Sequence, residues 1–499
     1  MKKIILVVFL YGLNLAHSQG LNHVWKLGYG GWFDKGVMTF DTNAYQLNIE
    51  HRPQGFAGTE ATICDSLGNL LMSSNGVWIA NATGDTMDNG AGLNPGSNVN
   101  AWPNGLLQIN SNVFLPYPDD TSKIVLLHHT IQSNGVYSPS YNLFYSIIDK
   151  TLDTGKGSVI SKNNVFFSDT LNWGFAVCKN ANGRDWWIVA LKDSSDIIFV
   201  FELTPNGVSY VASQKLNVPL AYGIITQMTF SQDGSQMTYN TYAVNSLNSY
   251  ALLFDFNRCT GIFSNEKVIQ LTNGYYLWGS SFSPSGEFVF VSGSNILFQI
   301  NTSTLNIDTV GLYDGFYDPP NAYTTFGMHY LAANGHIYMT SMGSALRIHE
   351  ISAPDSAGAL CNFQQHNIFL NFWNFRAVPN HPNYYLGCDT SLGCPCYAYA
   401  GLEENGLHDF KFRVYPNPVV NNIVNIGYIL PHTSAGSVGA SGVLKLYDVN
   451  GKQLYTQGLP PWSNEQSIKL PLLCNGMYNL VIQSGNFITS KKIIVAHDK

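Results

Sequence analysis

The sequence predicts an all-β protein, made of a seven-bladed β-propeller followed by a small β-sandwich domain. Three observations support this fold class. Charged residues make up only 11% of the 499 residues and aromatic residues 13%, a composition that suits sheets and turns better than helices. A two-strand unit with a tight polar turn recurs between residues 60 and 390. A different β-rich unit, with turns of its own, follows residue 413.

The recurring unit consists of an apolar strand, a tight polar turn and a second aromatic or β-branched strand. Its turn markers, which lie 55, 62, 51, 52, 49 and 47 residues apart, are Asp65, Asp120, Asn182, Asp233, Ser285, Asn334 and His381. A period of roughly 40–50 residues that holds four short strands is typical of propeller blades. We therefore expect about seven blades within residues 19–396. An array of β-sandwiches is the alternative, although it would not need a constant period.

The last copy of the unit, around residues 379–387, has no strands of its own after it. The N-terminal stretch 30–51 has the pattern of strands, so we expect it to complete the last blade. This arrangement would close the ring and leave no free sheet edge.

The N-terminus has the pattern of a secretory signal peptide. Lys2 and Lys3 precede an apolar run, and Ala16 and Ser18 place small residues at the −3 and −1 positions. We expect a signal peptide over residues 1–18, with cleavage between Ser18 and Gln19. The apolar run is too short to span a bilayer, and no later stretch is long enough, so we expect no transmembrane segment. A buried N-terminal strand is the alternative.

Charge and cysteine content exclude some classes of partner and leave others open. The 25 Lys and Arg against 32 Asp and Glu give a net charge of −7 without basic clusters, which excludes a nucleic-acid-binding protein. Export makes disulfides permissible for the eight cysteines. Three of them cluster, namely Cys388, Cys394 and Cys396. For this cluster we expect a local disulfide, with free buried thiols or a metal as alternatives, because its spacing is not that of a zinc ribbon.

Four stretches of the predicted propeller resemble a known group of proteins. They are WKLGYGGWFDKGVMTF from Trp25, ATICDSLGNLLMSSNGVWI from Ala61, MHYLAANGHIYM from Met328 and LRIHEISAPDSAGALCNFQ from Leu346. Together they resemble large secreted propeller proteins of Bacteroidota. The resemblance implies a seven-bladed fold and secretion, and it implies no known activity.

A polar linker over residues 397–413 separates the propeller from a second unit over residues 414–499. That unit has alternating strands and three glycine-containing turns, at Asn450-Gly451, Asn475-Gly476 and Gly485-Asn486, as expected of a small antiparallel sandwich. Two prolines at its start fix an extended entry that cannot join the interior of a sheet.

Ordered motifs in this second unit are similar to the C-terminal sorting domain (type A) of type IX secretion cargo. The residues that carry the similarity are Tyr415, Pro416, Asn417, Pro418, Gly451, Lys452, Gly476, Tyr478, Lys491 and Lys492. The resemblance implies that an outer-membrane type IX translocon reads the domain during export through the periplasm. It also implies that the domain is then removed and the cargo is released or linked to lipopolysaccharide.

Motifs for common catalytic and metal sites do not occur in the sequence. There is no G-x-S-x-G, no H-E-x-x-H and no phosphate-binding loop, so we name no catalytic, cofactor-binding or metal-binding residue. The oxygen-rich stretch 81–90 leaves Ca²⁺ open as an alternative to a plain turn, although it lacks the usual calcium-loop spacing.

Other conspicuous residues favour structural interpretations. His128 and His129 point to opposite faces if they lie on a strand, which makes a core or rim role the better interpretation. By the same alternation, one of Trp186 and Trp187 should lie in a blade interface and the other outside it, where packing is favoured over sugar stacking. Asp314 and Asp318 are each followed by Gly or Pro, so we interpret both as turn residues.

The sequence therefore predicts a secreted or cell-surface propeller that binds an extracellular glycan or protein ligand. The alternative is a secreted polysaccharide hydrolase or lyase with its site in the mouth of the propeller. A structural component of a surface layer is a third interpretation.

Overall fold

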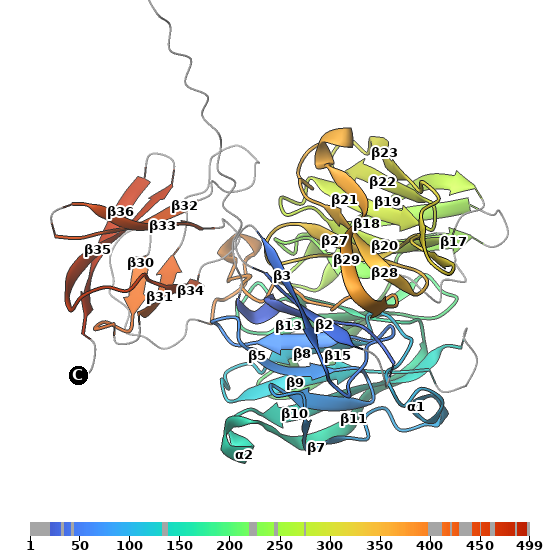
Figure 1. The fold of residues 1–499 in the computed structure, drawn as a ribbon, viewed down its shortest axis with the longest axis horizontal. Coiled ribbons are helices and arrows are strands. Elements are labelled where there is room, and N and C mark those ends of the chain that lie inside the picture. Colours follow the sequence, from blue (N-terminus) through green and yellow to red (C-terminus); the bar gives the residue numbers. More distant parts are fainter. Residues whose placement is uncertain are drawn as a thin grey trace, which may run out of the picture.

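The computed structural model describes residues 20–30, 34–40, 44–131, 138–218, 227–243, 248–273, 276–397, 412–419, 422–428, 442–449, 451–459, 465–484 and 487–496. The predicted cleavage site at Ser18 and Gln19 and most of the predicted linker lie outside these ranges. A large ring of sheets and a smaller two-sheet domain make up the fold (Figure 1).

Within the described residues, the strands of the ring fall into seven groups, of which the second and third join into one eight-stranded sheet; we refer to each group as a sheet. The first three are β1 (Val24–Leu27), β2 (Lys35–Phe40) and β3 (Tyr45–Glu50); β4 (Ala61–Cys64), β5 (Leu70–Ser74), β6 (Trp78–Asn81) and β7 (Thr86–Ala91); and β8 (Asn112–Pro116), β9 (Lys123–His128), β10 (Ser140–Asp149) and β11 (Ser158–Leu171). The next two are β12 (Ala176–Lys179), β13 (Trp186–Leu191), β14 (Ile197–Thr204) and β15 (Gly207–Lys215); and β16 (Met228–Phe230), β17 (Gln236–Ala243), β18 (Asn248–Asn257) and β19 (Ile262–Asn273). The last two are β20 (Leu277–Phe282), β21 (Phe288–Gly293), β22 (Ile296–Asn301) and β23 (Ile307–Leu312); and β26 (Phe326–Leu331), β27 (Ile337–Ser341), β28 (Ala345–Ile351) and β29 (Phe363–Asn374).

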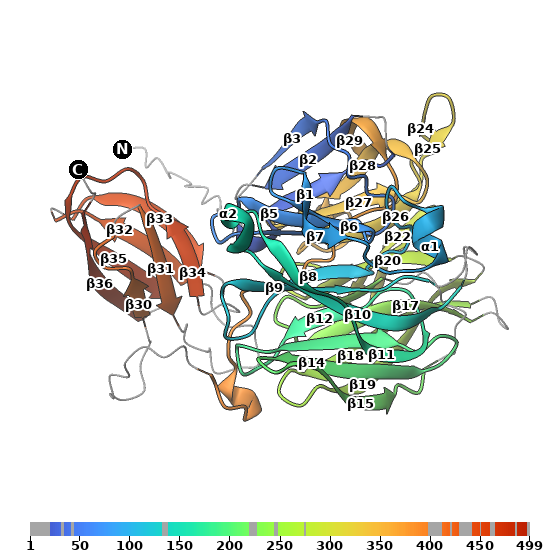
Figure 2. The same cartoon turned by 90° about the horizontal axis from the view of Figure 1, so that it is seen from below.

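Short elements interrupt or connect these sheets. They are the helices α1 (Ser97–Ala101) and α2 (Leu152–Gly155), the 3₁₀ turns Gly20–Asn22, Gly358–Cys361 and Thr390–Leu392, and the hairpin β24 (Tyr317–Asp318) with β25 (Ala322–Tyr323). Within the described part of the chain, β24 and β25 pair with each other alone, and the hairpin projects at one end of the ring (Figure 2). One parallel residue pair, Asp88 with Ser158, links the second and third sheets, and an isolated bridge pairs Leu171 of β11 with Lys192 after β13. Among the described residues, no helix has the length and apolarity needed to span a bilayer.

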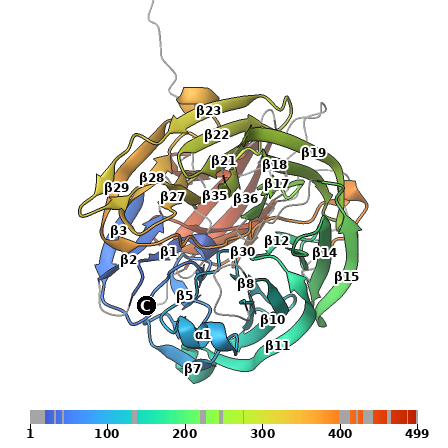
Figure 3. The ribbon, with the colours of Figure 1, turned by 90° about the vertical axis from the view of Figure 1, so that its right-hand side faces the viewer.

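The sheets follow one another around the ring in chain order (Figure 3). Their inner strands are buried on both faces, as in β13 with its sequence WWIVAL, whereas outer strands such as β15 alternate toward solvent. Apolar side chains fill the space between neighbouring sheets. The ring closes where Trp25 and Phe40 of the first sheet pack on Tyr338 of the last sheet. The centroid of the Trp25 ring lies 5.1 Å from that of Phe40 and 5.8 Å from that of Tyr338. The all-β propeller prediction is thus confirmed.

Six of the seven turn markers lie where the repeat places them, between the first and second strands of a four-stranded sheet. His381 does not, and the expectation that residues 30–51 complete a blade begun at residues 379–387 is wrong. Among the residues that the structure describes, the strands β1, β2 and β3 pair with one another and with no other strand. Pro379 and Pro382 lack backbone N–H groups, which disfavours a strand ladder in that segment.

The smaller domain has two sheets around its own apolar core. One contains β30 (Phe412–Tyr415), β31 (Ile423–Tyr428) and β34 (Glu465–Lys469). The other contains β32 (Gly442–Tyr447), β33 (Gln453–Leu459), β35 (Gly476–Ser484) and β36 (Phe487–Val495).

Candidate functional site

Residues 375–386, which we call the axial segment, run along the axis of the ring. Asn380 bonds to Tyr330 of β26 and donates to the Phe175 carbonyl next to β12 at 3.1 Å. His381 lies 3.0 Å from the Thr62 hydroxyl of β4, and Tyr384 donates to the Phe114 carbonyl of β8 at 2.9 Å. Only a segment on the axis can contact the inner strands of so many sheets.

The axial segment leaves little space inside the ring. A cavity of about 40 Å³ remains between residues 380–386 and the inner strands β12, β16, β20 and β26. A cavity of this volume admits water molecules and is too small for a sugar ring.

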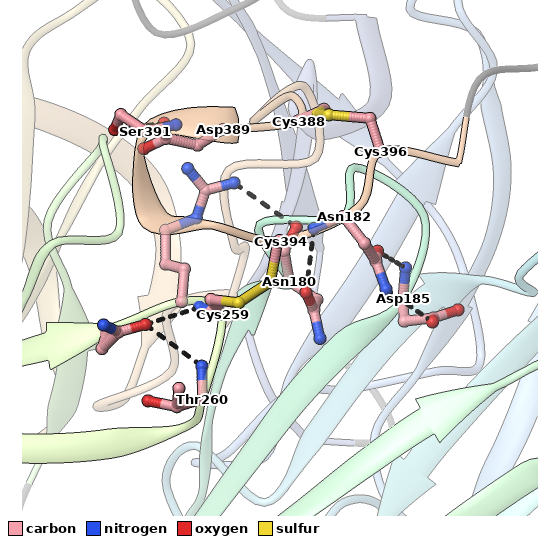
Figure 4. Close-up of a disulfide and its surroundings, with 12 residues drawn as sticks. Asn180, Asn182, Asp185, Cys259, Thr260, Cys388, Asp389, Ser391, Cys394 and Cys396 are labelled. Atoms are coloured by element: carbon pink, nitrogen blue, oxygen red, sulfur yellow. Dashed lines mark hydrogen bonds between the residues drawn. A yellow bond between two sulfur atoms is a disulfide. The ribbon is translucent and has the colours of Figure 1, made fainter.

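Two disulfides hold the chain where it leaves the axis (Figure 4). Cys388 bonds to Cys396, and Cys394 bonds to Cys259 in the turn between β18 and β19. We call this end of the ring the disulfide end. Arg258 supports the same region by donating to the Gly387 carbonyl at 2.6 Å.

Sequence reasoning missed Cys259 as a partner of the cysteine cluster, because the two lie 135 residues apart. Three other cysteines, Cys64, Cys178 and Cys361, are buried, and burial raises the pKa of Cys64 and of Cys178 to about 12. Such thiols are unreactive near neutral pH.

The histidine pair has a structural environment. His128 and His129 are both fully buried, and burial lowers the pKa of each to about 3. His128 lies 2.8 Å from the Asn94 side-chain oxygen, whereas His129 accepts from the Gly174 N–H at 3.1 Å. The two rings therefore serve different parts of the core.

Trp186 and Trp187 are both buried, so the prediction that one of them lies outside the blade interface is wrong. The Trp187 indole donates to the Arg258 carbonyl at 2.6 Å. Inner propeller strands are covered by a neighbouring sheet on each face, which removes the solvent side that strand alternation assumes.

Of the two aspartates interpreted as turn residues, only Asp314 is one. Its carboxylate accepts from the Phe316 N–H at 3.0 Å and pairs with His366 at 2.8 Å. Burial raises the pKa of Asp314, but the bond and charge of His366 and the bond from the Phe316 N–H together outweigh it, so the net shift of the pKa is downward. Asp318 instead lies in β24, where it is buried and pairs with Arg347 at 3.0 Å.

The oxygen-rich stretch 81–90 covers the end of β6, the turn after it and most of β7. The Asn81 side-chain oxygen accepts from the Thr83 N–H at 3.0 Å and from the Asp85 N–H at 3.2 Å, as in an Asx turn. Across the described residues, no three His, Cys, Asp or Glu side chains gather closely enough to hold a metal ion.

Glu60 has the most perturbed carboxyl group near the inner strands. It lies just before β4, is only 1% exposed, and accepts from the Lys26 N–H at 2.9 Å. Burial raises its pKa to about 8, although Lys26 and Arg52 oppose the shift. Lys26 and Arg52 both pair with Glu50. A perturbed pKa suits a catalytic acid, but this carboxyl is enclosed between β1 and β4, which suits a structural network.

An open pocket lies at the end of the ring opposite the disulfides, which we call the pocket end. The direction of strand β26 gives the position of the pocket. This strand begins after Thr325, which lines the pocket, and ends before the turn at Asn334, which lies at the disulfide end. The pocket has a volume of about 620 Å³ and is lined by Pro320, Asn321, Ala322, Tyr323, Thr325, Gly343, Ser344 and Trp373. None of these lining side chains is charged.

Aromatic pairs flank the pocket on both sides. On one side, the Tyr29 hydroxyl lies 2.6 Å from that of Ser344, and the Tyr29 ring packs on Phe375 at 5.9 Å. On the other side, Tyr276 stacks on Trp278 at 5.9 Å. Sequence reasoning missed this site, since its lining residues come from the β24–β25 hairpin and from separate places in the last sheet, and the flanking aromatic pairs come from neighbouring sheets.

In the smaller domain, the predicted sorting motifs come together around β36. Asn417 accepts from the Ile494 N–H at 2.8 Å and donates to the Lys492 carbonyl at 3.1 Å. Tyr415 ends β30, and Pro416 and Pro418 flank Asn417. The segment that contains the prolines is thereby fixed to the last strand.

The other sorting motifs form turns and an exposed edge. Gly451 has a φ of +79°, which favours glycine, and Lys452 donates its N–H to the Asp448 carboxylate at 2.9 Å. Gly476 begins β35, where the Tyr478 hydroxyl donates to the Cys474 carbonyl at 2.9 Å. Lys491 and Lys492 are exposed on β36.

Solved structures give only distant similarities. Hydrazine synthase of Kuenenia stuttgartiensis is 11% identical over 75% of this chain and 92% of that chain, with a TM-score of 0.37. A protein of unknown function from Desulfotomaculum acetoxidans is 12% identical over 66% and 90%, with a TM-score of 0.35. Oligogalacturonate lyase of Vibrio parahaemolyticus is 10% identical over 66% and 88%, with a TM-score of 0.31. These scores are too low to support an argument about function.

The comparison with protein families gives a definite result for one domain. No curated protein sequence matches the chain. Residues 413–496 match the family described as the secretion system C-terminal sorting domain, in which the motifs around β36 lie. This match confirms the predicted sorting domain and indicates export to the cell surface or secretion, so residues 413–496 belong to the family of C-terminal sorting domains.

Proposed function

We propose that this protein is type IX secretion cargo whose propeller binds an extracellular ligand at the pocket end. In this proposal a signal peptide over residues 1–18 directs the chain to the periplasm, and the sorting domain then directs it across the outer membrane. The producing cell would belong to the Bacteroidota, in agreement with the resemblance of the propeller stretches.

The axial segment is the observation that carries the binding proposal. It lies along the axis of the ring, and the cavity of about 40 Å³ beside it cannot admit a sugar ring. The pocket end offers aromatic faces, amides and hydroxyls without a charged lining residue. Such surfaces bind by stacking and hydrogen bonding.

The direct test applies the chain over residues 19–499 to glycan and protein arrays and assays it for release of oligosaccharide. We expect binding to at least one array component and no release of oligosaccharide. Release of oligosaccharide above the level of a heat-denatured control would contradict the proposal and favour a hydrolase or lyase.

A further inference from the structure

We infer that the pocket beside β24 and β25 binds an uncharged polysaccharide chain. This inference rests on the proposed function and deepens it by naming the class of ligand and the residues that contact it.

The lining of the pocket matches the chemistry of an uncharged sugar. Tyr323 and Trp373 offer flat aromatic faces, and Asn321, Thr325 and Ser344 offer amide and hydroxyl groups. A sugar ring has an apolar C–H face and a rim of hydroxyls that both donate and accept hydrogen bonds. Aromatic faces suit the first, and amides and hydroxyls suit the second.

The β24–β25 hairpin presents exposed aromatic rings on a fixed base. Tyr317 and Tyr323 are 51% and 56% exposed, whereas large aromatic side chains are usually more buried. The two rings lie 5.8 Å apart. Asp318 fixes the hairpin, since its carboxylate accepts from the Leu346 N–H at 3.2 Å and pairs with Arg347 at 3.0 Å. A fixed base reduces the entropy lost when a ligand binds.

The aromatic surface extends beyond the pocket, which favours a chain over a single sugar. Trp278 donates to the Ser294 hydroxyl at 2.8 Å, and the Ser294 carbonyl accepts from the Phe326 N–H, directly after the pocket residue Thr325. The stacked pair of Tyr276 and Trp278 therefore lies on one side of the pocket. The pair of Tyr29 and Phe375 lies on the other side, linked through Ser344.

Acidic polysaccharides and extended peptides fit this surface less well. Arg347 beside the hairpin is paired with Asp318, and its guanidinium lies 5.2 Å from Phe316 and 5.0 Å from Phe369. The Arg376 guanidinium lies 4.5 Å from the Phe375 ring, so both cations already contact aromatic rings. The strands β24 and β25 have two residues each, which is too short to pair with an added peptide strand.

Affinity electrophoresis of the chain over residues 19–499 tests this inference. The gels contain a β-glucan, a xylan, a galactomannan or an arabinogalactan as uncharged probes, and polygalacturonate as the acidic probe. Tyr323→Ala removes a contact ring, Tyr323→Phe retains it, and Tyr141→Ala is the matched control, because Tyr141 is 46% exposed on the separate strand β10. Thermal melts verify that all variants fold like the parent chain.

We expect at least one uncharged polysaccharide to retard the chain. Tyr323→Ala should weaken that binding by about 5- to 30-fold, the usual effect of removing an aromatic contact residue, whereas the other two variants should bind like the parent. Stronger retardation by polygalacturonate would overturn the ligand class. Binding of a glycan that Tyr323→Ala leaves unchanged would overturn the site but not the proposed function. Absence of binding on every glycan and protein array would overturn both.

Discussion

Replacing Cys259 and Cys394 together with serine opens the longer of the two disulfide loops. This disulfide joins residues 135 positions apart, whereas the disulfide between Cys388 and Cys396 joins residues only 8 apart. Both hold the same stretch of chain at the disulfide end. The two double variants therefore change similar surroundings but differ in the length of loop that each disulfide closes.

The difference in loop length sets the expected loss of stability. A cross-link restricts the unfolded chain more when its loop is longer, and the loop-entropy relation gives about 5 kcal/mol for 135 residues and about 2.5 kcal/mol for 8. The Cys259→Ser/Cys394→Ser variant should thus lose about 2.5 kcal/mol more free energy of unfolding than Cys388→Ser/Cys396→Ser.

Urea unfolding followed by tryptophan fluorescence measures this difference. Nine of the ten tryptophans precede residue 374, so the signal reports on the propeller. An equal or larger loss in the Cys388→Ser/Cys396→Ser variant would refute the reasoning from loop length.

Four further predictions concern protonation, export, metal and processing. Burial raises the pKa of Glu60 from the ordinary 4.5 to about 8, so between these pH values the folded chain keeps a proton that the unfolded chain releases. The free energy of unfolding should therefore fall from pH 4.5 to pH 8. Urea unfolding should show a weaker dependence of this free energy on pH for Glu60→Gln. An unchanged profile would argue against a buried proton. Deleting residues 414–499 should leave a folded propeller in the periplasm, and normal amounts in the culture medium would contradict the sorting role. A chelator should leave the melting temperature unchanged, since Asn81 already accepts from two backbone N–H groups; a clear drop would indicate bound calcium. Mass spectrometry of the exported chain should find Gln19 at its N-terminus, and an intact Met1 would disprove cleavage after Ser18.

Local turn chemistry explains what the sequence could predict. Markers such as Asp233 and Asn334 fix tight turns by bonds within a few residues, so they identify first hairpins without knowledge of the fold. The motifs around Tyr415 and Gly451 belong to one continuous domain and could be recognised for the same reason.

Features that depend on distant parts of the chain could not be predicted. His381 has the spacing of a turn marker, but two neighbouring prolines and the space inside the ring put it on the axis. The partner of Cys394 depends on how distant sheets are arranged, and the approach of Tyr323 to Trp373 depends on how the β24–β25 hairpin lies against the last sheet. No pattern in the sequence encodes these distances.

The axial segment has a consequence for the order of folding. It contacts the start of the ring over very long sequence separations, 364 residues between Leu21 and Tyr385 and 319 between Thr62 and His381. Contacts of this kind slow folding, although each doubling of a loop costs only about 0.6 kcal/mol in stability. A chain that emerges N-terminus first cannot complete its propeller until nearly four hundred residues are available. Any export machinery that acts on the chain before the axial segment is available therefore meets an incompletely folded propeller. The sorting domain follows the axial segment in the sequence.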